Sequence, residues 1–388
     1  MNQETIYLDF AATTPVDERV VQAMLPFFTE IFGNPSSIHR YGQKAEAAVE
    51  SAREDLARLI HANPEEIIFT GCGSESDNMA IRGVAAHQRF FKGKKHLLIS
   101  PVEHPAILQT ARDLAKRENF ELEFLPINEY GQVDPDDVKK LIRPETAMVS
   151  VMYANNEIGS INPIAQIGLL CEENQIPFHT DAVQAAAHIP IDVLHDHIGL
   201  LSLGAHKFYG PKGVGAIFLR NGISVLPAIT GGSQEFGLRA GTHNVPLIMG
   251  FVEAYKLSIE EMYARNLRFI ELRDYLINAV LGTIPESKLT GHPTLRLPNH
   301  ASFVFRGVDG NMLIMFLDQA GFACSSGSAC KSGNPKPSEV LTALGFSDNW
   351  SMGSLRVTLG KSTTKSQIDS FLDVLPKIIK QSRKYSSE

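Results

Sequence analysis

The chain has 388 residues, of which 44% are hydrophobic and 20% charged, so it has ample apolar material for a large buried core in about two to three compact units. Its net charge of -7 leaves no basic surplus, which argues against nucleic acid as the main partner. No apolar run approaches the roughly 18 residues of a membrane span, and the N-terminus lacks a signal-peptide pattern. Four cysteines without close pairs exclude a disulfide scaffold and a zinc site. We therefore expect a soluble, cytoplasmic protein.

Between residues 67 and 219, short apolar runs alternate with helical periodicity. Seven runs predict strands, at 67–69, 97–99, 121–125, 148–152, 177–180, 200–203 and 216–219. Three helices are expected between them, at 75–91, 105–116 and 163–173. This alternation is typical of βα units, so we predict an α/β fold with a mostly parallel sheet covered on both faces.

The pattern changes after residue 245. A long helix is expected at 246–281, because apolar residues recur there at steps of three and four. It is followed by predicted strands at 301–305 and 355–359, by a helix at 310–320 and by a closing amphipathic helix from residue 366. We predict a large domain at 15–260 and a smaller α+β domain built from 1–14 and 261–388.

The strongest local signal is a lysine that directly follows the strand at 200–203. Lys207 is flanked by His206 and small residues. Burial lowers the pKa of a lysine and makes its amine a usable nucleophile, so Lys207 is a candidate for a Schiff base. The alternative is an ordinary lysine in a surface turn. The GPKGVG sequence at 210–215 is not a phosphate-binding loop, since it lacks the Gly-Lys-Ser/Thr ending and precedes a strand.

An acidic residue ends the strand at 177–180. Asp181 could pair with the N–H of a pyridinium ring and preserve the strength of that ring as an electron sink. Gln184, three residues on, could reach the phenolic oxygen of the same ring. Taken alone, Asp181 would more often cap a helix. Its combination with Lys207 favours the cofactor interpretation.

Further candidates follow other strands. In the turn at 71–76, backbone N–H groups at a helix start and the hydroxyl of Ser74 could hold a phosphate, unless Ser74 is only an N-cap. His104 could stack on an aromatic cofactor, or could merely start a helix. Asn156 also follows a strand. Open α/β sheets bind ligands beyond the carboxyl ends of their strands, so we expect these side chains to converge with Asp181 and Lys207.

The C-terminal part adds a thiol and a cation. Residues 324–335 are rich in Gly, Ser, Asn and Pro, which predicts a mobile loop. Cys330 in this loop is expected to be reactive because Lys331 beside it favours the thiolate, although an accidental loop thiol is the alternative. Cys324 follows an apolar run, so its thiol is expected to be buried and inert. Arg356 could clamp a carboxylate through two parallel hydrogen bonds, or form a surface ion pair.

Together these residues resemble the cysteine desulfurases of the iron–sulfur-cluster-assembly type, in the class V aminotransferase family of fold type I. The resemblance covers nearly the whole chain. The motifs that carry it are YLDFAATT at 7–14, GNPSS at 33–37, HKFYGPKG at 206–213, SGSAC at 326–330 and LRVTLG at 355–360. It implies a large domain with a mostly parallel seven-stranded sheet and a smaller α+β domain.

The resemblance also implies pyridoxal 5'-phosphate (PLP) as cofactor, bound to Lys207 as a Schiff base. His104 would stack on its ring, Asp181 would hold the pyridine nitrogen, and Gln184 would contact the phenolic oxygen. The groups implied to hold the phosphate are Gly73, Ser74, His206 and, in place of the serine common in the family, the backbone of Gly204.

Substrate and partners are implied in the same way. Arg356 would bind the carboxylate of L-cysteine, and Asn156 would orient cofactor and substrate. Thr242 would reach the phosphate of a neighbouring subunit, which implies a homodimer. No metal site is predicted, apart from a transient iron–sulfur cluster that Cys330 could ligate.

The implied reaction removes sulfur from L-cysteine, with Cys330, Lys207 and His104 as catalytic residues. Lys207 would take the α-proton, and Cys330 would attack the substrate sulfur as a thiolate. Alanine would leave, and a persulfide would remain on Cys330 for sulfur-acceptor proteins in cluster assembly or tRNA thiolation.

Other functions remain open from the sequence alone. An aminotransferase or kynureninase on the same scaffold is possible, although an aminotransferase has no need of a loop thiol. A selenocysteine lyase is harder to separate, because sulfur and selenium substrates differ little in size. A catalytically silent scaffold for sulfur transfer would not need Lys207, Asp181, Cys330 and Arg356 together.

Overall fold

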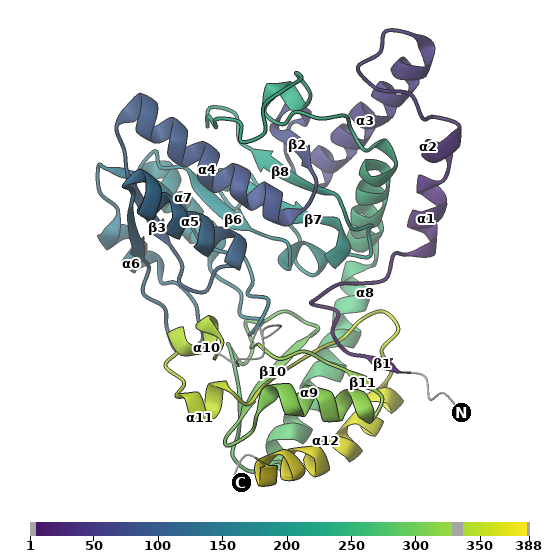
Figure 1. Ribbon diagram of the computed structural model, residues 1–388, viewed down its shortest axis with the longest axis vertical. Coiled ribbons are helices and arrows are strands. Elements are labelled where there is room, and N and C mark those ends of the chain that lie inside the picture. Colours follow the sequence, from purple (N-terminus) through teal and green to yellow (C-terminus); the bar gives the residue numbers. More distant parts are fainter. Residues whose placement is uncertain (1–4, 328–336, 386–388) are drawn as a thin grey trace.

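A seven-stranded sheet forms the centre of the larger lobe in the computed structural model, which describes residues 5–327 and 337–385 (Figure 1). Its strand order is β2-β8-β7-β6-β5-β3-β4. The strands are β2 (Ile67–Thr70), β3 (His96–Ile99), β4 (Glu121–Phe124), β5 (Thr146–Ser150), β6 (Phe178–Asp181), β7 (Leu200–Gly204) and β8 (Gly215–Leu219). Only β8 is antiparallel to its neighbours β2 and β7, which confirms the mostly parallel sheet.

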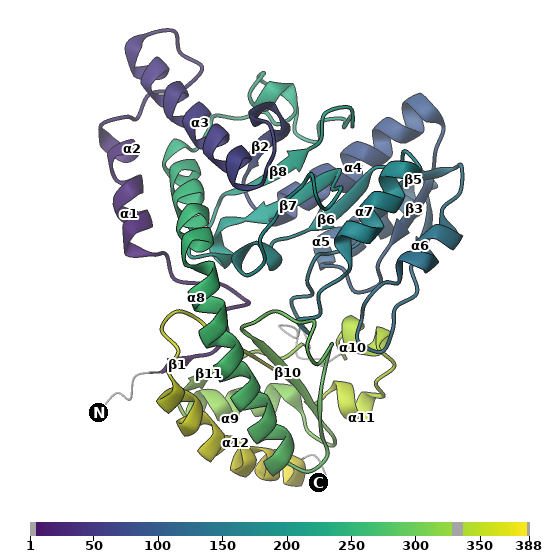
Figure 2. The same cartoon turned by 180° about the vertical axis from the view of Figure 1, so that it is seen from behind.

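Helices pack on both faces of this sheet (Figures 1 and 2). On one face, α4 (Gly73–Lys92) and α5 (Pro105–Glu118) share a core with β2, β3 and β7. On the other, α3 (Arg40–Leu59), α7 (Ile164–Glu173) and the first half of α8 (Val245–Thr283) enclose a second core. The short helices α1 (Glu18–Met24), α2 (Pro26–Thr29) and α6 (Pro135–Leu141) complete the lobe. Two-sided burial explains why β2, β5, β7 and β8 are mostly apolar, whereas the edge strand β4 alternates charged and apolar residues and is partly exposed.

The smaller lobe contains an antiparallel sheet of order β12-β10-β9 and a parallel pair, β1 with β11. Its strands are β1 (Ile6–Tyr7), β9 (Ser287–Leu289), β10 (His300–Phe305), β11 (Phe322–Ala323) and β12 (Ser354–Thr358). Its helices are α9 (Gly310–Gln319), α10 (Glu339–Ala343), α11 (Asp348–Ser351) and α12 (Lys365–Tyr385). The N-terminal chain takes part, because Leu8 is fully buried in the core of this lobe.

The predicted long helix is confirmed as α8, whose 39 residues span about 60 Å and connect the lobes (Figure 2). Phe251 and Tyr255 are buried in the core of the larger lobe, and Phe269 and Leu276 in that of the smaller. The domain boundary expected at residue 260 falls inside this helix and stays a prediction. Within the described ranges, no helix is both long and apolar enough to cross a membrane.

Three predicted strands extend too far, those at 121–125 and 355–359 by one residue and the one at 148–152 by two. The strand expected at 148–152 ends at Ser150. Val151 and Met152 are nevertheless buried, at 0% and 1% exposure, and Val151 belongs to the core of the larger lobe. The apolar pattern therefore persists beyond the end of the strand, and hydropathy alone does not mark it.

Candidate active site

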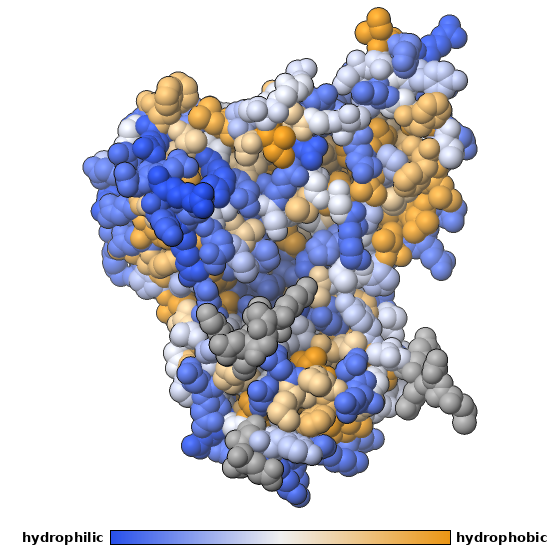
Figure 3. Space-filling view, viewed as in Figure 1, coloured by the Kyte–Doolittle hydropathy of each residue, from blue (hydrophilic) through white to orange (hydrophobic). Residues whose placement is uncertain are grey.

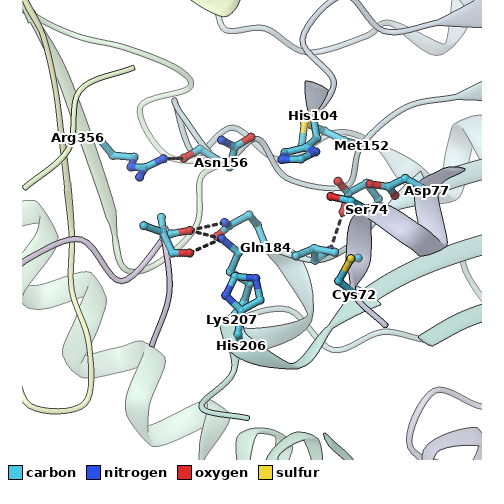
Figure 4. A pocket seen from close by; sticks show the side chains of 15 residues that line it. Cys72, Ser74, Asp77, His104, Met152, Asn156, Gln184, His206, Lys207 and Arg356 are labelled. Carbon is cyan, nitrogen blue, oxygen red and sulfur yellow. Dashed lines mark hydrogen bonds between the residues drawn. The ribbon is translucent and has the colours of Figure 1, made fainter. Parts of the chain in front are cut away.

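A cavity of about 300 Å³ lies beyond the carboxyl ends of β6 and β7, where the two lobes meet. Figure 4 shows Arg356 and Asn156 at one side of it and Ser74 and Asp77 at the other, with Lys207 between them. The sequence-predicted residues that line it are Gly73, Ser74, His104, Asn156, Asp181, Gln184, His206, Lys207 and Arg356. The expected convergence at this edge of the sheet is therefore confirmed.

Two other predicted site residues, Gly204 and Thr242, do not line this cavity, and a third is not among the described residues. Gly204 ends β7 behind the wall, where an added Cβ would lie 3.4 Å from Cγ1 of Val183 and 3.6 Å from the backbone nitrogen of Gly73. Thr242 is exposed and outside the cavity, so a contact between it and a cofactor would require a second subunit. Cys330 lies outside the described residues.

Lys207 ends a short 3₁₀ turn (Ala205–Lys207) that follows β7 directly. Its Nζ donates hydrogen bonds to the carbonyl oxygens of Ala11, at 2.6 Å, and Ala12, at 2.8 Å. Burial, together with the charge of Arg356, lowers the pKa of Lys207 to about 8. A much larger fraction of this amine is neutral at physiological pH than in a free lysine, and the neutral amine is the nucleophile.

Asp181 is the last residue of β6 and is 4% exposed. Its Oδ1 accepts a hydrogen bond from the backbone N–H of Val183, at 2.9 Å, which is the only donor to this carboxyl among the described residues. Burial raises its pKa, and the nearby His104 and Lys207 oppose that rise. The second carboxyl oxygen remains available for a ring N–H.

His104 combines both roles that the sequence suggested for it. It caps α5, because its Nδ1 accepts a hydrogen bond from the N–H of Ala106 at 3.1 Å. Its ring also lines the cavity. Burial lowers the pKa of His104, so the ring is neutral at physiological pH. Since Nδ1 is an acceptor, the proton of this neutral ring is on Nε2.

The start of α4 supplies an anion site. Cys72 is the N-cap, with Gly73 and Ser74 in the first turn, so the alternative of an N-cap at Ser74 is wrong. A side chain at position 73 would collide with Val183, since an added Cβ would lie 2.7 Å from Cγ2 of that residue. The glycine therefore keeps the backbone N–H groups of a 20-residue helix open to the cavity. Burial lowers the pKa of the adjoining His206 to about 4, so its ring is neutral.

Arg356 on β12 is 8% exposed and forms a buried ion pair, not the surface pair considered as its alternative. Its Nη2 donates to Oδ1 of Asp9 at 2.8 Å, and its Nη1 donates to the carbonyl oxygen of Asn156 at 3.0 Å. Its Nε is buried without a partner among the described residues. The guanidinium is thus held in one orientation and retains unused donors for an incoming carboxylate.

The sequence did not predict that the N-terminal segment helps to form the wall of the cavity. Asp9 orients Arg356, and the carbonyl oxygen of Ala11 accepts hydrogen bonds from both Lys207 and the Nε2 of Gln184, the latter at 2.8 Å. The YLDFAATT motif at 7–14 was available as a signal, but its contacts join residues nearly 350 positions apart in the chain.

Two buried acids were also missed. Asp77 on α4 and Glu103 beside His104 are 1% and 2% exposed, and burial together with the charge of Asp181 raises the pKa of each carboxyl well above its usual range. Asp77 Oδ1 and both carboxyl oxygens of Glu103 lack hydrogen-bond partners among the described residues. Single ligand atoms of Asp77, His104 and Asp181 lie within 4.8 Å of one another. Because like charges so close cannot all persist in a buried site, we infer that Asp77 and Glu103 are protonated and that Asp181 carries the charge.

These residues fit PLP. The amine of Lys207 suits its aldehyde, the carboxyl of Asp181 suits its ring nitrogen, and the open N-terminus of α4 suits its phosphate. An α/β fold of this type with a nucleophilic lysine at the carboxyl ends of its strands defines the class of PLP-dependent enzymes of fold type I.

The comparisons with known proteins agree. Residues 6–371 match the family model described as aminotransferase class-V, and the chain therefore belongs to this family, whose cofactor is PLP. It is 47% identical over 388 residues to the cysteine desulfurase IscS of Clostridium botulinum, covering 100% of this chain and 97% of the relative. It is 46% identical over 383 residues to the cysteine desulfurase IscS of Methanosarcina thermophila, covering 99% and 94%.

Solved structures show the same likeness. A NifS-like protein superposes with a TM-score of 0.90 at 34% identity, covering 97% of this chain and all of the other. The structure described as SspA in complex with cysteine superposes with a TM-score of 0.80 at 35% identity, covering 92% and 99%.

Proposed function

We propose that the chain is a PLP-dependent cysteine desulfurase that converts L-cysteine to L-alanine and keeps the sulfur as a persulfide on Cys330. The observation that carries this proposal is the position of a lysine of lowered pKa, Lys207, in the same cavity as a buried arginine with unused donors, Arg356. The full-length similarity to cysteine desulfurases supports the choice of substrate.

The cavity residues bind and orient an amino acid. Arg356 binds the substrate carboxylate, because its guanidinium is held by Asp9 and Asn156 and the residue is only 8% exposed. Bound PLP supplies an aldehyde for the substrate amine and an electron sink for the reacting carbons. Lys207, with its pKa near 8, accepts the proton from Cα of the substrate. The ring of His104 and the carboxyl of Asp181 hold the cofactor in a fixed orientation.

Cys330 receives the sulfur. Its thiolate attacks the substrate sulfur, so that an S–S bond forms while the C–S bond breaks and its electron pair passes to the alanine product. The pairing of Ser325 with the backbone of Arg356, by hydrogen bonds of 2.7 and 3.4 Å, supports this role. Cys330 is five positions after Ser325 in the sequence, and a fully extended chain of that length reaches about 17 Å.

We include a homodimer in this proposal. Apolar side chains gather over α1 and α2 and the chain that follows them (Figure 3). They include Leu25, Phe28 and Phe32, which are 49%, 55% and 63% exposed. A surface of this kind is typical of a protein interface. In a dimer, the exposed Thr242 of one subunit would contact the phosphate of the cofactor bound to the other subunit.

The product of the reaction implies sulfur-acceptor proteins as further partners, since a persulfide on Cys330 must be discharged before the next turnover. A cytoplasmic location belongs to the same proposal. Cys72, Cys171 and Cys324 are all free thiols, and a reducing compartment would keep them so.

The test is direct. Purified protein with PLP and a thiol reductant is incubated with L-cysteine, and sulfide and alanine are measured together. We expect equal amounts of both, and almost none from Cys330→Ala. The same assay with L-selenocysteine separates the two activities, because a strong preference for the selenium substrate, retained in Cys330→Ala, would identify a selenocysteine lyase instead. Formation of pyruvate together with sulfide, or of 3-mercaptopyruvate without sulfide, in place of alanine would refute the proposal.

A further inference from the structure

Three titratable side chains from three different elements meet at one end of the cavity. Asp77 lies on α4, His104 precedes α5 and Asp181 ends β6, and all three line the cavity. One side-chain nitrogen or oxygen atom of each lies within 4.8 Å of one from each of the others. Figure 4 shows Asp77 at the same side of the cavity as Ser74, away from Arg356. The proposed function uses His104 and Asp181, but it leaves Asp77 without a role.

Asp77 is buried without a counter-ion. It is 1% exposed, and its Oδ1 has no hydrogen-bond partner among the described residues. The Nε2 of His179 lies 3.8 Å from that oxygen, but both ring nitrogens already bond, at 3.0 Å each, to the hydroxyls of Ser150 and Ser202. Burial lowers the pKa of His179 to about 3, so this ring is neutral. Within the part of the chain that the structure describes, no cation therefore pairs with the carboxyl of Asp77.

The surroundings of Asp77 favour its neutral form. Burial raises the pKa of this carboxyl most, and the charge of Asp181 raises it next. The hydroxyl of Ser202 opposes this rise, whereas Glu103 and Cys72 add to it. Asp77 is therefore a neutral acid at physiological pH and has an O–H group to donate.

Asp181 is the acceptor that suits this O–H group. Its Oδ1 accepts one hydrogen bond, from the N–H of Val183 at 2.9 Å. An ionised carboxyl offers about four acceptor positions, so a ring N–H and a further donor both find room on it. The separation of at most 4.8 Å from Asp77 is short enough for a small rotation of the carboxyl or for one bridging water. A neutral donor stabilises the charge on Asp181, whereas a second charge in the same place would oppose it.

We propose that Asp77 is a positioning residue for PLP: as a neutral acid it donates a hydrogen bond to Asp181, keeps that carboxyl ionised, and so keeps the ring nitrogen of the cofactor protonated. The inference rests on the PLP site of the proposed function, but not on the choice of L-cysteine as substrate. A protonated ring is the stronger electron sink, so Asp77 acts on the loss of the proton from Cα and not on the binding of the amino acid.

The first experiment reads the ring nitrogen directly. Wild type, Asp77→Asn and Asp77→Leu are loaded with PLP whose ring nitrogen is isotope-labelled, and this nitrogen is followed by NMR as the pH is raised. Asparagine keeps a donor in the same place, whereas leucine has a similar size without one. We expect the ring nitrogen of Asp77→Leu to lose its proton at least about one pH unit below wild type, the size of one hydrogen bond to a charged group. Asp77→Asn should titrate like wild type, and a ring nitrogen of Asp77→Leu that stays protonated as far as that of wild type would refute the inference.

Thr180→Val is the matched control. Thr180 adjoins Asp181 on β6, is fully buried, and has a hydroxyl without a partner among the described residues, yet it does not line the cavity. We expect its ring nitrogen to titrate like that of wild type. A shift as large as that of Asp77→Leu would show that the loss of any buried polar group near Asp181 has this effect, and would contradict a specific role for Asp77.

A second readout does not require PLP. Because folding raises the pKa of Asp77, its contribution to stability is full below the unfolded pKa of about 3.9 and is lost as the pH rises through the folded value. Asparagine does not titrate, so wild type should lose thermal stability relative to Asp77→Asn as the pH rises from about 4. With and without PLP, we expect the unfolding temperatures of the two proteins to differ more at about pH 8 than at about pH 5. A difference that does not change with pH would show that Asp77 is not a neutral acid, and would overturn the inference.

The third experiment measures the loss of the Cα proton without sulfur chemistry. Each protein is incubated with L-alanine in deuterated water, and exchange of the Cα proton is followed by proton NMR. We expect exchange about tenfold slower in Asp77→Leu, a rate within about twofold of wild type in Asp77→Asn, and an unchanged half-saturation concentration of L-alanine in both. A rise in that concentration instead of a fall in rate would place Asp77 in the amino-acid site and refute the inference.

A double-mutant cycle tests whether Asp77 acts through Asp181. In an Asp181→Asn background, Asp77→Leu should slow the exchange hardly further, because the carboxylate that Asp77 stabilises is absent. Additive losses would contradict the inference. A wild type that exchanges this proton but forms no persulfide would overturn the proposed function and leave the role of Asp77 intact.

Discussion

Replacing Arg356 with alanine tests the substrate site most directly. Arg356 is 8% exposed, its guanidinium is held by Asp9 and Asn156, and its buried Nε lacks a partner among the described residues. Removing one partner of such a desolvated charge pair costs about 2–4 kcal/mol of substrate binding. At about 1.4 kcal/mol per factor of ten, the concentration of L-cysteine at half-saturation should rise about 30- to 700-fold. PLP should remain bound, since no residue implied to hold it is changed.

The assay is a titration with L-cysteine, read from the absorbance of bound PLP, alongside the PLP content of the protein. Arg356→Lys keeps the charge but not the planar fork of donors, so we expect it to recover only part of the affinity. Arg112→Ala is the matched control, because this arginine pairs with Glu339 on the surface. An unchanged half-saturation concentration in Arg356→Ala would remove Arg356 from the substrate site and refute the reasoning.

Three further predictions concern the lysine, the subunit contact and the loop thiol. Burial lowers the pKa of Lys207 to about 8, so in cofactor-free protein its acylation, which needs the neutral amine, should reach half its limiting rate near pH 8; a midpoint at the ordinary lysine value of about 10.4, measured by peptide mapping, would contradict the burial argument. Phe28→Asp with Phe32→Asp should reduce the mass measured by light scattering to that of one chain, and a fully active monomeric wild type would exclude the homodimer. Cys330→Ala should bind L-cysteine without forming a persulfide, whereas Cys324→Ala should stay active, because Cys324 is buried and burial raises the pKa of its thiol; a persulfide found on Cys324 by mass spectrometry would reverse this assignment.

Local patterns were sufficient for most elements of the larger lobe. The predicted helices at 75–91 and 105–116 lie within α4 and α5, and the strands at 67–69 and 200–203 lie within β2 and β7. These segments are buried on both faces or along one helical side, so their apolar periodicity reports the structure directly. By contrast, α3 was not predicted, since four of its seven buried positions are Gly or Ala rather than large apolar residues. The antiparallel direction of β8 is decided by the tight turns at 205–214, which no hydrophobic pattern records.

The residues of the candidate site likewise fall into those that the sequence predicted and those that it did not. Residues that follow strands could be placed together from the sequence, because the carboxyl ends of parallel strands meet at one edge, and Ser74, His104, Asn156, Asp181 and Lys207 all line the cavity. The family resemblance added the role of Arg356 and the cofactor. None of this required knowledge of how the two lobes pack.

What the sequence by itself determined about this protein was therefore the kind of fold, the family and the reactive groups, because these follow from short-range patterns and motifs. The tertiary structure decided how those groups are tuned and held: the pairing of Asp9 with Arg356, the burial that lowers the pKa of Lys207, and the position of Asp77 beside Asp181. Each of these depends on residues far apart in the chain that come together only when the chain packs. Desolvation and long-range contacts are properties of the packed chain, so a local pattern can suggest that a group is buried but does not fix its partners or the size of its pKa shift.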